Sequence, residues 1–132
     1  TEEAVIGELA SYYAMISEVD DNIGKILDAL KKSEKYDNTI IIFASDNGLA
    51  VGQHGLIGKQ NLYDHSIRVP LIISGPGIKK GVRTESLVYL HDLFPTIADL
   101  VGIETPINIY AKSLKHILDD PNETVRENVF YL

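Results

Sequence analysis

The chain is 132 residues long, 45% of its residues are hydrophobic, and its formal net charge is −7; these values describe one modest globular domain that can bury a core. The acidic balance offers no basic surface to a phosphate backbone, which argues against nucleic-acid binding and against electrostatic docking to an anionic membrane. The chain has no cysteine, so disulfides and thiolate metal sites are excluded.

A long amphipathic helix is predicted over residues 9–30. Acidic residues stand toward its start and Lys31 and Lys32 follow its end, the arrangement that the helix dipole favours. Apolar side chains recur every three or four residues, which places them on one helical face. They are Leu9, Tyr12, Tyr13, Ile16, Val19, Ile23, Ile26, Leu27 and Leu30.

Two apolar runs predict the strands of a sheet. Residues 39–44 form a continuous isoleucine-rich run without polar alternation, which is typical of a strand covered on both faces. Residues 69–74, "VPLIIS", predict a second strand, and the "GPG" turn follows it. Between the two strands, residues 48–60 contain four glycines and show neither a helical nor a strand-like hydrophobic period, so they are predicted as a loop. The order of elements predicts an α/β fold with a mixed, largely parallel sheet and packed helices.

A second, shorter helix is predicted over residues 92–101. Asp92 is a plausible N-terminal cap, and Gly102 fits a C-terminal stop. Pro95 is compatible with this helix only in its first turn. The remaining predicted elements are a short strand at 86–89, a loop at 106–110, a short helix at 111–120 and a final strand at 128–132.

The first chemically informative residues, Asp46 and Asn47, directly follow the first strand. Ligands of α/β sheets gather outside the carboxyl ends of strands. A carboxylate beside a carboxamide offers hard oxygen donors of the kind that bind Ca²⁺ or Mg²⁺. Two donors are too few, since calcium takes about six to eight oxygens. Asp, Asn and Gly are also common turn formers, so these three residues taken alone favour a plain turn over a metal site.

Lys59 and His54 lie on the glycine-rich loop after this pair. Lys59 can supply a point charge to an anionic oxygen, and His54 can donate to a substrate oxygen or protonate a leaving group. The simpler interpretations are a solvated surface lysine and a loop histidine bonded to the backbone. His65, close to Asp64 and Arg68, is expected in a structural polar cluster that fixes the exit of the loop.

Several stretches together resemble the sulfatase family, within the alkaline-phosphatase-like superfamily. These stretches occur in the same order as in the family, with sensible spacing, over nearly the whole chain: "NTIIIFASDNG", "GQHGLIGKQNLYDHSIRVPLIISGPGI", "LVYLHDLFPTIADLVGI" and "AKSLKHIL". The upstream segment "YYAMISEVDDNIGKILDAL" resembles the helix that precedes the first of these stretches in the family.

The resemblance implies a role for each candidate residue. Asp46 and Asn47 match a pair of divalent-cation ligands, with Ca²⁺ expected before Mg²⁺. Lys59 matches the lysine that contacts the sulfate group, and His54 falls at a substrate-side position. The family's nucleophile is a hydrated formylglycine, and its substrates are sulfated small molecules or glycans. The resemblance also points to periplasmic, secreted or lysosomal proteins.

One departure from the family pattern is large. The formylglycine is made from Cys or Ser in a Cys/Ser-x-Pro-x-Arg stretch, and the serine two residues before a proline, Ser74, has Ile78 in place of the arginine. Residues 1–132 therefore resemble the C-terminal part of a sulfatase-like catalytic domain, an incomplete alkaline-phosphatase-like fold that we expect to be inactive alone. A strand buried on both faces also needs neighbours, so self-association is expected.

Two other functions remain compatible with the sequence. A phosphatase, phosphodiesterase or phosphonate hydrolase of the same superfamily would recognise a similar tetrahedral anion. A non-catalytic module could have kept the fold to bind an anion or a partner protein. Asp46, Asn47 and Lys59 are present together, which favours the sulfatase interpretation over such a module, because a module without catalysis does not need all three.

Overall fold

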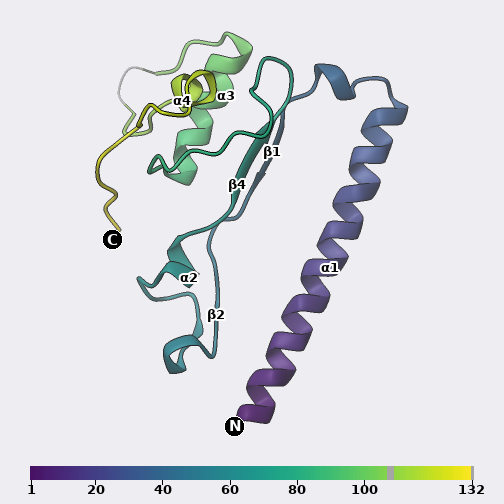
Figure 1. The fold of residues 1–132 in the computed structure, drawn as a ribbon, viewed down its shortest axis with the longest axis vertical. Coiled ribbons are helices and arrows are strands. Elements are labelled where there is room, and N and C mark those ends of the chain that lie inside the picture. Colours follow the sequence, from purple (N-terminus) through teal and green to yellow (C-terminus); the bar gives the residue numbers. More distant parts are fainter. Residues whose placement is uncertain (107–108, 132) are drawn as a thin grey trace. The chain divides into compact units, whose positions relative to one another are not determined.

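The computed structural model describes residues 1–106 and 109–131, which fold as two compact units, Thr1–Pro76 and Gly77–Leu132 (Figure 1). In the described part of the chain, no helix combines the length and the apolar character needed to cross a membrane. The first unit contains α1 (Glu2–Lys32), a 3-10 turn (Tyr36–Asn38), β1 (Ile41–Ala44), β2 (Ala50–Val51), a 3-10 turn (Gln53–Gly55), β3 (Ile57–Gly58), α2 (Asp64–Ile67) and β4 (Leu71–Ser74). The second contains a 3-10 turn (Leu90–Asp92), α3 (Leu93–Val101) and α4 (Lys115–Asp119).

The long helix α1 confirms the predicted amphipathic helix and extends it at both ends. Its first turn is capped by Thr1, whose hydroxyl oxygen accepts a hydrogen bond from the N–H of Ala4 at 3.4 Å. Lys31 and Lys32 occupy its last turn, next to the negative end of the helix dipole. None of its residues is fully buried, so within the described chain its apolar face is only partly covered.

The main sheet of the first unit pairs β1 with β4, and the pairing is antiparallel, so the predicted largely parallel sheet is wrong. Phe43 lies opposite Ile72 in this register. These two side chains are 40% and 59% exposed, so the strand is not covered on both faces in this structure. A continuous apolar run reports the hydrophobicity of a strand but carries no information on the direction of its partner. Parallel neighbours also need a crossover of a dozen or more residues, usually an α-helix, and the α-helix between these strands, α2, has only one turn.

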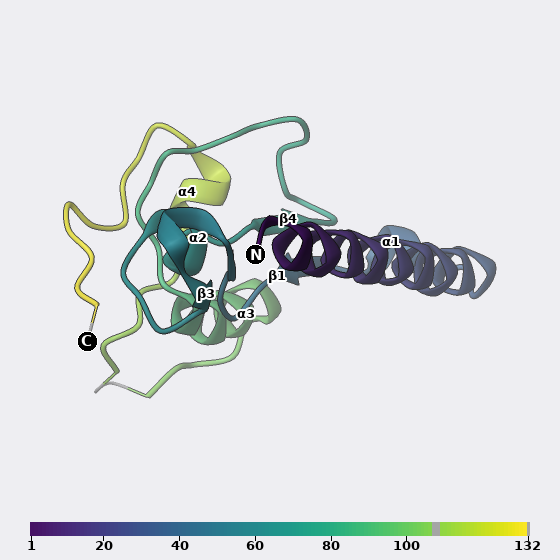
Figure 2. The same ribbon diagram turned by 90° about the horizontal axis from the view of Figure 1, so that it is seen from below.

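The segment between β1 and β4 was predicted as an unpaired loop and instead contains a second, very short antiparallel pair. Ala50 pairs with Gly58 and Val51 with Ile57. Two-residue strands are too short to show a periodic pattern, which is why the sequence gives no sign of them. Figure 2 shows β3 and the single-turn helix α2 close to one another, and the N–H of Gly48 bonds to the carbonyl of Ser66 at the start of the pair.

The second unit confirms the predicted helix pair, with α3 at 93–101 and α4 at 115–119. Pro95 lies in the first turn of α3, as expected, and Gly102 ends the helix with a φ of 74°, in the left-handed region that favours glycine. The small core of this unit includes Ala98, Leu114, Ile117 and Val125.

Two strands predicted for the second unit are not strands. Residues 86–89 and 128–131 have no regular structure, while Leu132 and part of the predicted loop 106–110 lie outside the described residues. Side-chain hydrogen bonds join residues 86–89 to residues 125 and 130 in place of a backbone ladder. The hydroxyl oxygen of Ser86 accepts a hydrogen bond from the N–H of Val125 at 2.8 Å, and the hydroxyl of Tyr89 donates to the carbonyl of Phe130 at 3.0 Å.

Candidate functional site

The predicted cation ligands Asp46 and Asn47 form a tight bend directly after β1. The hydroxyl of Ser45 donates to the carbonyl of Asn47 at 2.8 Å, and the Asp46 carboxylate accepts a hydrogen bond from the N–H of Asn47 at 2.9 Å. Both bonds are local to the bend at Asp46, so the turn interpretation describes the backbone correctly. The Asp46 side chain is nevertheless exposed and Asn47 is half-buried, so the turn leaves the carboxylate accessible.

Gly48 holds this bend against α2 at a distance that no other residue permits. Its N–H donates to the carbonyl of Ser66 at 2.9 Å. A Cβ atom at this position would stand 2.0 Å from the carbonyl oxygen of His65, a backbone atom that cannot move aside. The close approach fixes where the Asp46–Asn47 bend lies relative to the chain leading into β4, and the glycine in "SDNG" was its only sequence signal.

Lys59 lies next to Asn47, a contact that was not predicted from the sequence. The β2–β3 pair folds the chain back, so that the residue after Gly58 returns to the bend that precedes Ala50. The Lys59 ammonium donates a hydrogen bond to Asn47 Oδ1 at 2.8 Å, across a separation of 12 residues. The amide nitrogen of Asn47 donates to the carbonyl of Gly48 at 2.9 Å, which orients the amide oxygen toward the lysine.

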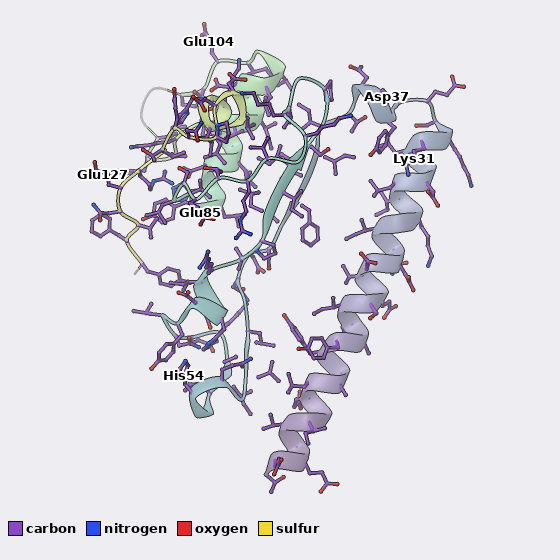
Figure 3. The ribbon with its side chains drawn as sticks, viewed as in Figure 1. Lys31, Asp37, His54, Glu85, Glu104 and Glu127 are labelled. Carbon is purple, nitrogen blue, oxygen red and sulfur yellow. The ribbon has the colours of Figure 1, made fainter. Side chains whose placement is uncertain are left out.

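His54 lies on the turn that connects β2 to β3 (Figure 3) and makes different contacts. Its backbone has a φ of 54° and a ψ of 22°, a left-handed conformation that is uncommon for residues other than glycine and costs about 1 kcal/mol or more. Its imidazole stacks on the ring of Tyr63, with centroids 4.2 Å apart and an interplanar angle of 20°. The described contacts of His54 therefore do not include Lys59 or the Asp46–Asn47 bend.

His65 belongs to this ring cluster, and its buried Nε2 has no hydrogen-bond partner among the described residues. Its ring centroid lies 5.6 Å from that of Tyr63 and 5.8 Å from that of His54. Asp64 and Arg68 do form an ion pair at 3.9 Å, but both side chains are well exposed. Tyr63 was not singled out from the sequence, because one tyrosine in a loop carries no periodic signal.

The Asp46–Asn47 pair fits a hard cation in donor chemistry but not in number. A carboxylate and a carboxamide are the oxygen donors that Ca²⁺ and Mg²⁺ take. Calcium binds about six to eight oxygens, and among residues 1–106 and 109–131 no group of three or more His, Cys, Asp or Glu side chains gathers to hold a metal. Asp46 and Asn47 can therefore provide part of a coordination shell.

The family model described as Sulfatase matches residues 1–103 of the chain. The chain belongs to the sulfatase family. It is 38% identical over 130 residues to arylsulfatase K of Mus musculus, an alignment that covers 98% of this chain and 23% of the relative. It is also 38% identical over 117 residues to the N-acetylglucosamine-6-O-sulfatase of Bacteroides thetaiotaomicron, covering 88% of the chain and 21% of that enzyme.

The fold of this sulfatase-family chain agrees with its sequence relatives. A solved phosphonate monoester hydrolase of Agrobacterium radiobacter aligns with a TM-score of 0.79 and 36% identity, over 85% of this chain and 23% of the hydrolase. This likeness supports the alkaline-phosphatase-like fold. The chain thus spans between 21% and 23% of the length of the relatives named here.

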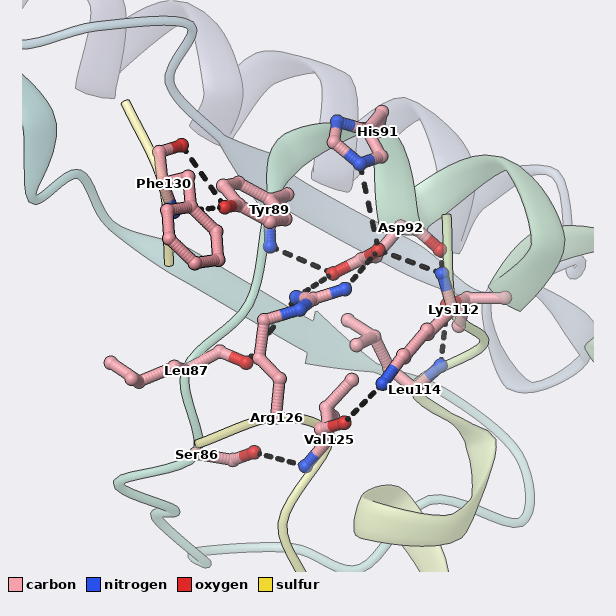
Figure 4. A network of polar contacts seen from close by, with 11 residues as sticks. Ser86, Leu87, Tyr89, His91, Asp92, Lys112, Leu114, Val125, Arg126 and Phe130 are labelled. Atoms are coloured by element: carbon pink, nitrogen blue, oxygen red, sulfur yellow. Dashed lines mark hydrogen bonds and ion pairs between the residues drawn. The ribbon is translucent and has the colours of Figure 1, made fainter. Parts of the chain in front are cut away.

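The second unit of the sulfatase-family chain contains a buried polar network centred on Asp92 (Figure 4). Asp92 was predicted as the cap of the second helix, and it does stand at the start of α3, but its carboxylate makes no capping bond to that helix. The carboxylate instead accepts hydrogen bonds from the N–H groups of Tyr89 at 2.7 Å and Lys112 at 2.8 Å. It also forms a bidentate ion pair with Arg126, whose guanidinium lies over the ring of Tyr89.

This network changes the acidity of its central carboxyl. Burial raises the pKa of Asp92, but the hydrogen bonds from Arg126 and from two backbone N–H groups outweigh it, so the pKa lies below its ordinary value. The hydrogen bond to Asp92 correspondingly raises the pKa of Arg126. Asp92 is therefore a structural carboxylate that is charged at neutral pH, and both of its oxygens are already engaged by protein donors.

Proposed function

We propose that this chain provides cation-binding and sulfate-contacting side chains of a sulfuric ester hydrolase. The observation that carries the proposal is the 2.8 Å contact between the Lys59 ammonium and Asn47 Oδ1. It joins a positive charge to one of two neighbouring hard oxygen donors, in a chain whose net charge of −7 offers no general attraction for an anion. A local arrangement of this kind is what a tetrahedral sulfate group needs.

Each residue of the site has a distinct role in this proposal. Asp46 and Asn47 donate oxygens to a divalent cation, with Ca²⁺ expected before Mg²⁺, and a bound cation supplies charge neutralisation on the sulfate oxygens. Lys59 places a point charge beside a further sulfate oxygen. His54, exposed on its turn, protonates the leaving oxygen of the ester.

The nucleophile of the reaction is not among the 132 residues. The sequence contains no cysteine, and Ser74, in the "SGPGI" stretch, is part of β4. Hydrolysis therefore requires a formylglycine that other polypeptide provides, and the 132 residues alone do not turn over sulfate esters.

A sulfated small molecule or glycan is the substrate class that we infer. The basis is the name of the Bacteroides relative, an N-acetylglucosamine-6-O-sulfatase. A phosphonate monoester is the second candidate, because the Agrobacterium structure shares the fold at 36% identity and its substrate presents a similar tetrahedral anion. A non-catalytic anion-binding or partner-binding module is less favoured, because such a module does not need Asp46, Asn47 and Lys59 together.

A chimaera tests this proposal directly. The aligned segment of the Bacteroides sulfatase is replaced by this chain, and kcat/KM is measured with p-nitrophenyl sulfate and with a phenyl phosphonate ester. We expect sulfate hydrolysis, and we expect Lys59→Ala and Asp46→Ala each to lower it by about 100-fold. Lys35→Ala, an exposed lysine away from the site, is the matched control and leaves the rate unchanged.

The outcomes separate the candidate functions. A folded chimaera that prefers the phosphonate ester supports the second candidate, and one that hydrolyses neither ester supports a non-catalytic module. Metal-dependent sulfate hydrolysis by the 132-residue chain on its own would contradict the proposed absence of the nucleophile.

A further inference from the structure

The contact between Lys59 and Asn47 places two functions on one oxygen atom. Asn47 Oδ1 accepts the hydrogen bond of the Lys59 ammonium at 2.8 Å, and the proposed function assigns the same oxygen to a divalent cation. The amide cannot readily turn to offer another oxygen, because its nitrogen is engaged by the carbonyl of Gly48 at 2.9 Å. Its backbone is also held, since the carbonyl of Asn47 accepts the Ser45 hydroxyl.

Two positive charges on this oxygen would repel each other strongly. A calcium ion binds its oxygen ligands at about 2.4 Å, so the ion and the ammonium would stand only about 4 to 5 Å apart even on different lone pairs. The repulsion between a double and a single charge at this separation is appreciable even in a near-aqueous environment, and corresponds to about a tenfold change in a dissociation constant. The exposed site supplies that environment.

The backbone of Lys59 is held in place, whereas its side-chain ammonium can move away from Asn47. The carbonyl of Lys59 accepts the N–H of Asn61 at 2.9 Å, and Gly58 before it is held in the β2–β3 pair. The side chain itself is exposed and linked to Asn47 through its terminal ammonium. A lysine side chain has four rotatable carbons, so the ammonium reaches a different oxygen at little cost.

We propose that Lys59 is an internal competitor for the cation site, and that cation binding to Asn47 releases the Lys59 ammonium to the sulfate group. This inference rests on the proposed function, because it takes Asp46 and Asn47 as cation ligands. It adds that cation and anion bind with positive coupling through one side chain. Each ligand removes Lys59 from Asn47, so each favours the binding of the other.

The test is a calcium titration of the 132-residue chain followed by NMR, without any measurement of catalysis. The reporters are the backbone amides of Asp46 and Asn47 and the side-chain amide of Asn47. We expect Lys59→Met to lower the dissociation constant of Ca²⁺ about tenfold, since the competing charge is gone. Lys59→Gln serves as a second variant, and Lys35→Met removes an equal charge elsewhere in the same unit and leaves the constant unchanged.

The coupling is measured by repeating the titration with methyl sulfate at constant ionic strength. Methyl sulfate is expected to tighten Ca²⁺ binding to the parent chain and to have no such effect on Lys59→Met. Equal or weaker Ca²⁺ binding by the Lys59 variants would overturn this inference and leave the proposed cation pair intact. If Ca²⁺ shifts none of the reporters in the parent chain or the variants, the inference falls, whereas the cation pair is tested separately by Asp46→Ala in the chimaera, where the other ligands of the shell are present.

Discussion

Asp46 and Asp92 are two aspartates that end or begin an element of this fold, and their surroundings are opposite. Asp92 is fully buried, and its carboxylate is bonded to two backbone N–H groups and to both terminal nitrogens of Arg126. Asp46 is exposed, and the bond described for its carboxylate comes from the N–H of the next residue. The same side chain thus serves architecture in one unit and is free to bind a ligand in the other.

The difference follows from how a carboxylate is compensated. A buried charge is tolerated only when it is paired and its lone pairs are used, so a fully satisfied carboxylate has nothing left to give a substrate. An exposed carboxylate stays hydrated, and replacing some of that water by a cation costs little free energy. The number of partners, more than the residue type, separates the structural aspartate from the candidate ligand.

The largest effect expected from this comparison is on stability. Asp92→Asn leaves the Arg126 guanidinium, whose side chain is 8% exposed, without its counter-charge. This should lower the free energy of unfolding of the second unit by about 3 to 5 kcal/mol. Asp46→Asn should change stability by less than about 0.5 kcal/mol. Urea unfolding, followed by the amide signals of each unit, measures the stability change caused by each variant. Equal changes for the two variants would contradict the distinction between a structural and an exposed aspartate.

A smaller loss is expected at Thr96, which belongs to the same buried network. Its hydroxyl donates to the carbonyl of Asp92 at 2.6 Å and accepts from the N–H of Leu114 at 2.8 Å, so it ties α3 to the start of α4. Thr96→Val keeps the shape of the side chain but leaves the buried N–H of Leu114 without an acceptor. This should lower the free energy of unfolding by about 1 to 3 kcal/mol. Faster hydrogen exchange at the Leu114 amide would show this loss of stability. Thr124→Val, at an exposed site, is the control and should leave that exchange rate unchanged.

The pH dependence of the second unit should carry the signature of Asp92. Its pKa in the folded state is lowered below the ordinary 3.8, so its contribution to stability is fully present above that value. The contribution is lost as the pH falls through the lowered folded-state pKa. The stability gap between the parent chain and Asp92→Asn should therefore narrow below about pH 4. A gap that stays constant in acid would show that the charge of Asp92 does not stabilise the fold.

The smallest expected effect concerns the first unit, whose sheet has two strands and thus two open edges. Phe43 and Ile72 face solvent on paired strands, and open apolar edges favour pairing with another copy. We expect weak, concentration-dependent association in light scattering, and we expect Phe43→Thr to reduce it. A monomer at every concentration would contradict the prediction.

Local features of the fold could be predicted from the sequence, whereas its long-range pairings could not. The three-and-four spacing predicts α1, and the isoleucine run predicts β1, because both patterns are complete within one element. Strand direction depends on β4, which an apolar run does not encode. The bidentate ion pair between Asp92 and Arg126 spans 34 residues, and no local sequence pattern around either residue predicts the other as its partner.

The candidate site shows the same division. Asp46 and Asn47 could be chosen as oxygen donors from chemistry alone, but their roles and that of Lys59 came from the family resemblance. The contact that brings Lys59 to Asn47 depends on two-residue strands that leave no periodic trace. The ring contacts of His54 with Tyr63 depend on a left-handed backbone conformation that the residue type alone does not impose.

The nesting of one strand pair inside another also predicts an order of folding. The β2–β3 pair closes between Ala50 and Gly58, whereas the β1–β4 pair must join Ile41 to Ser74. Closing a loop costs about 0.6 kcal/mol more for each doubling of its length, so the inner hairpin has the lower entropic barrier and forms first. Once it has formed, the outer connection is effectively shorter. The segment that brings Lys59 to Asn47 therefore assembles before the sheet that carries it.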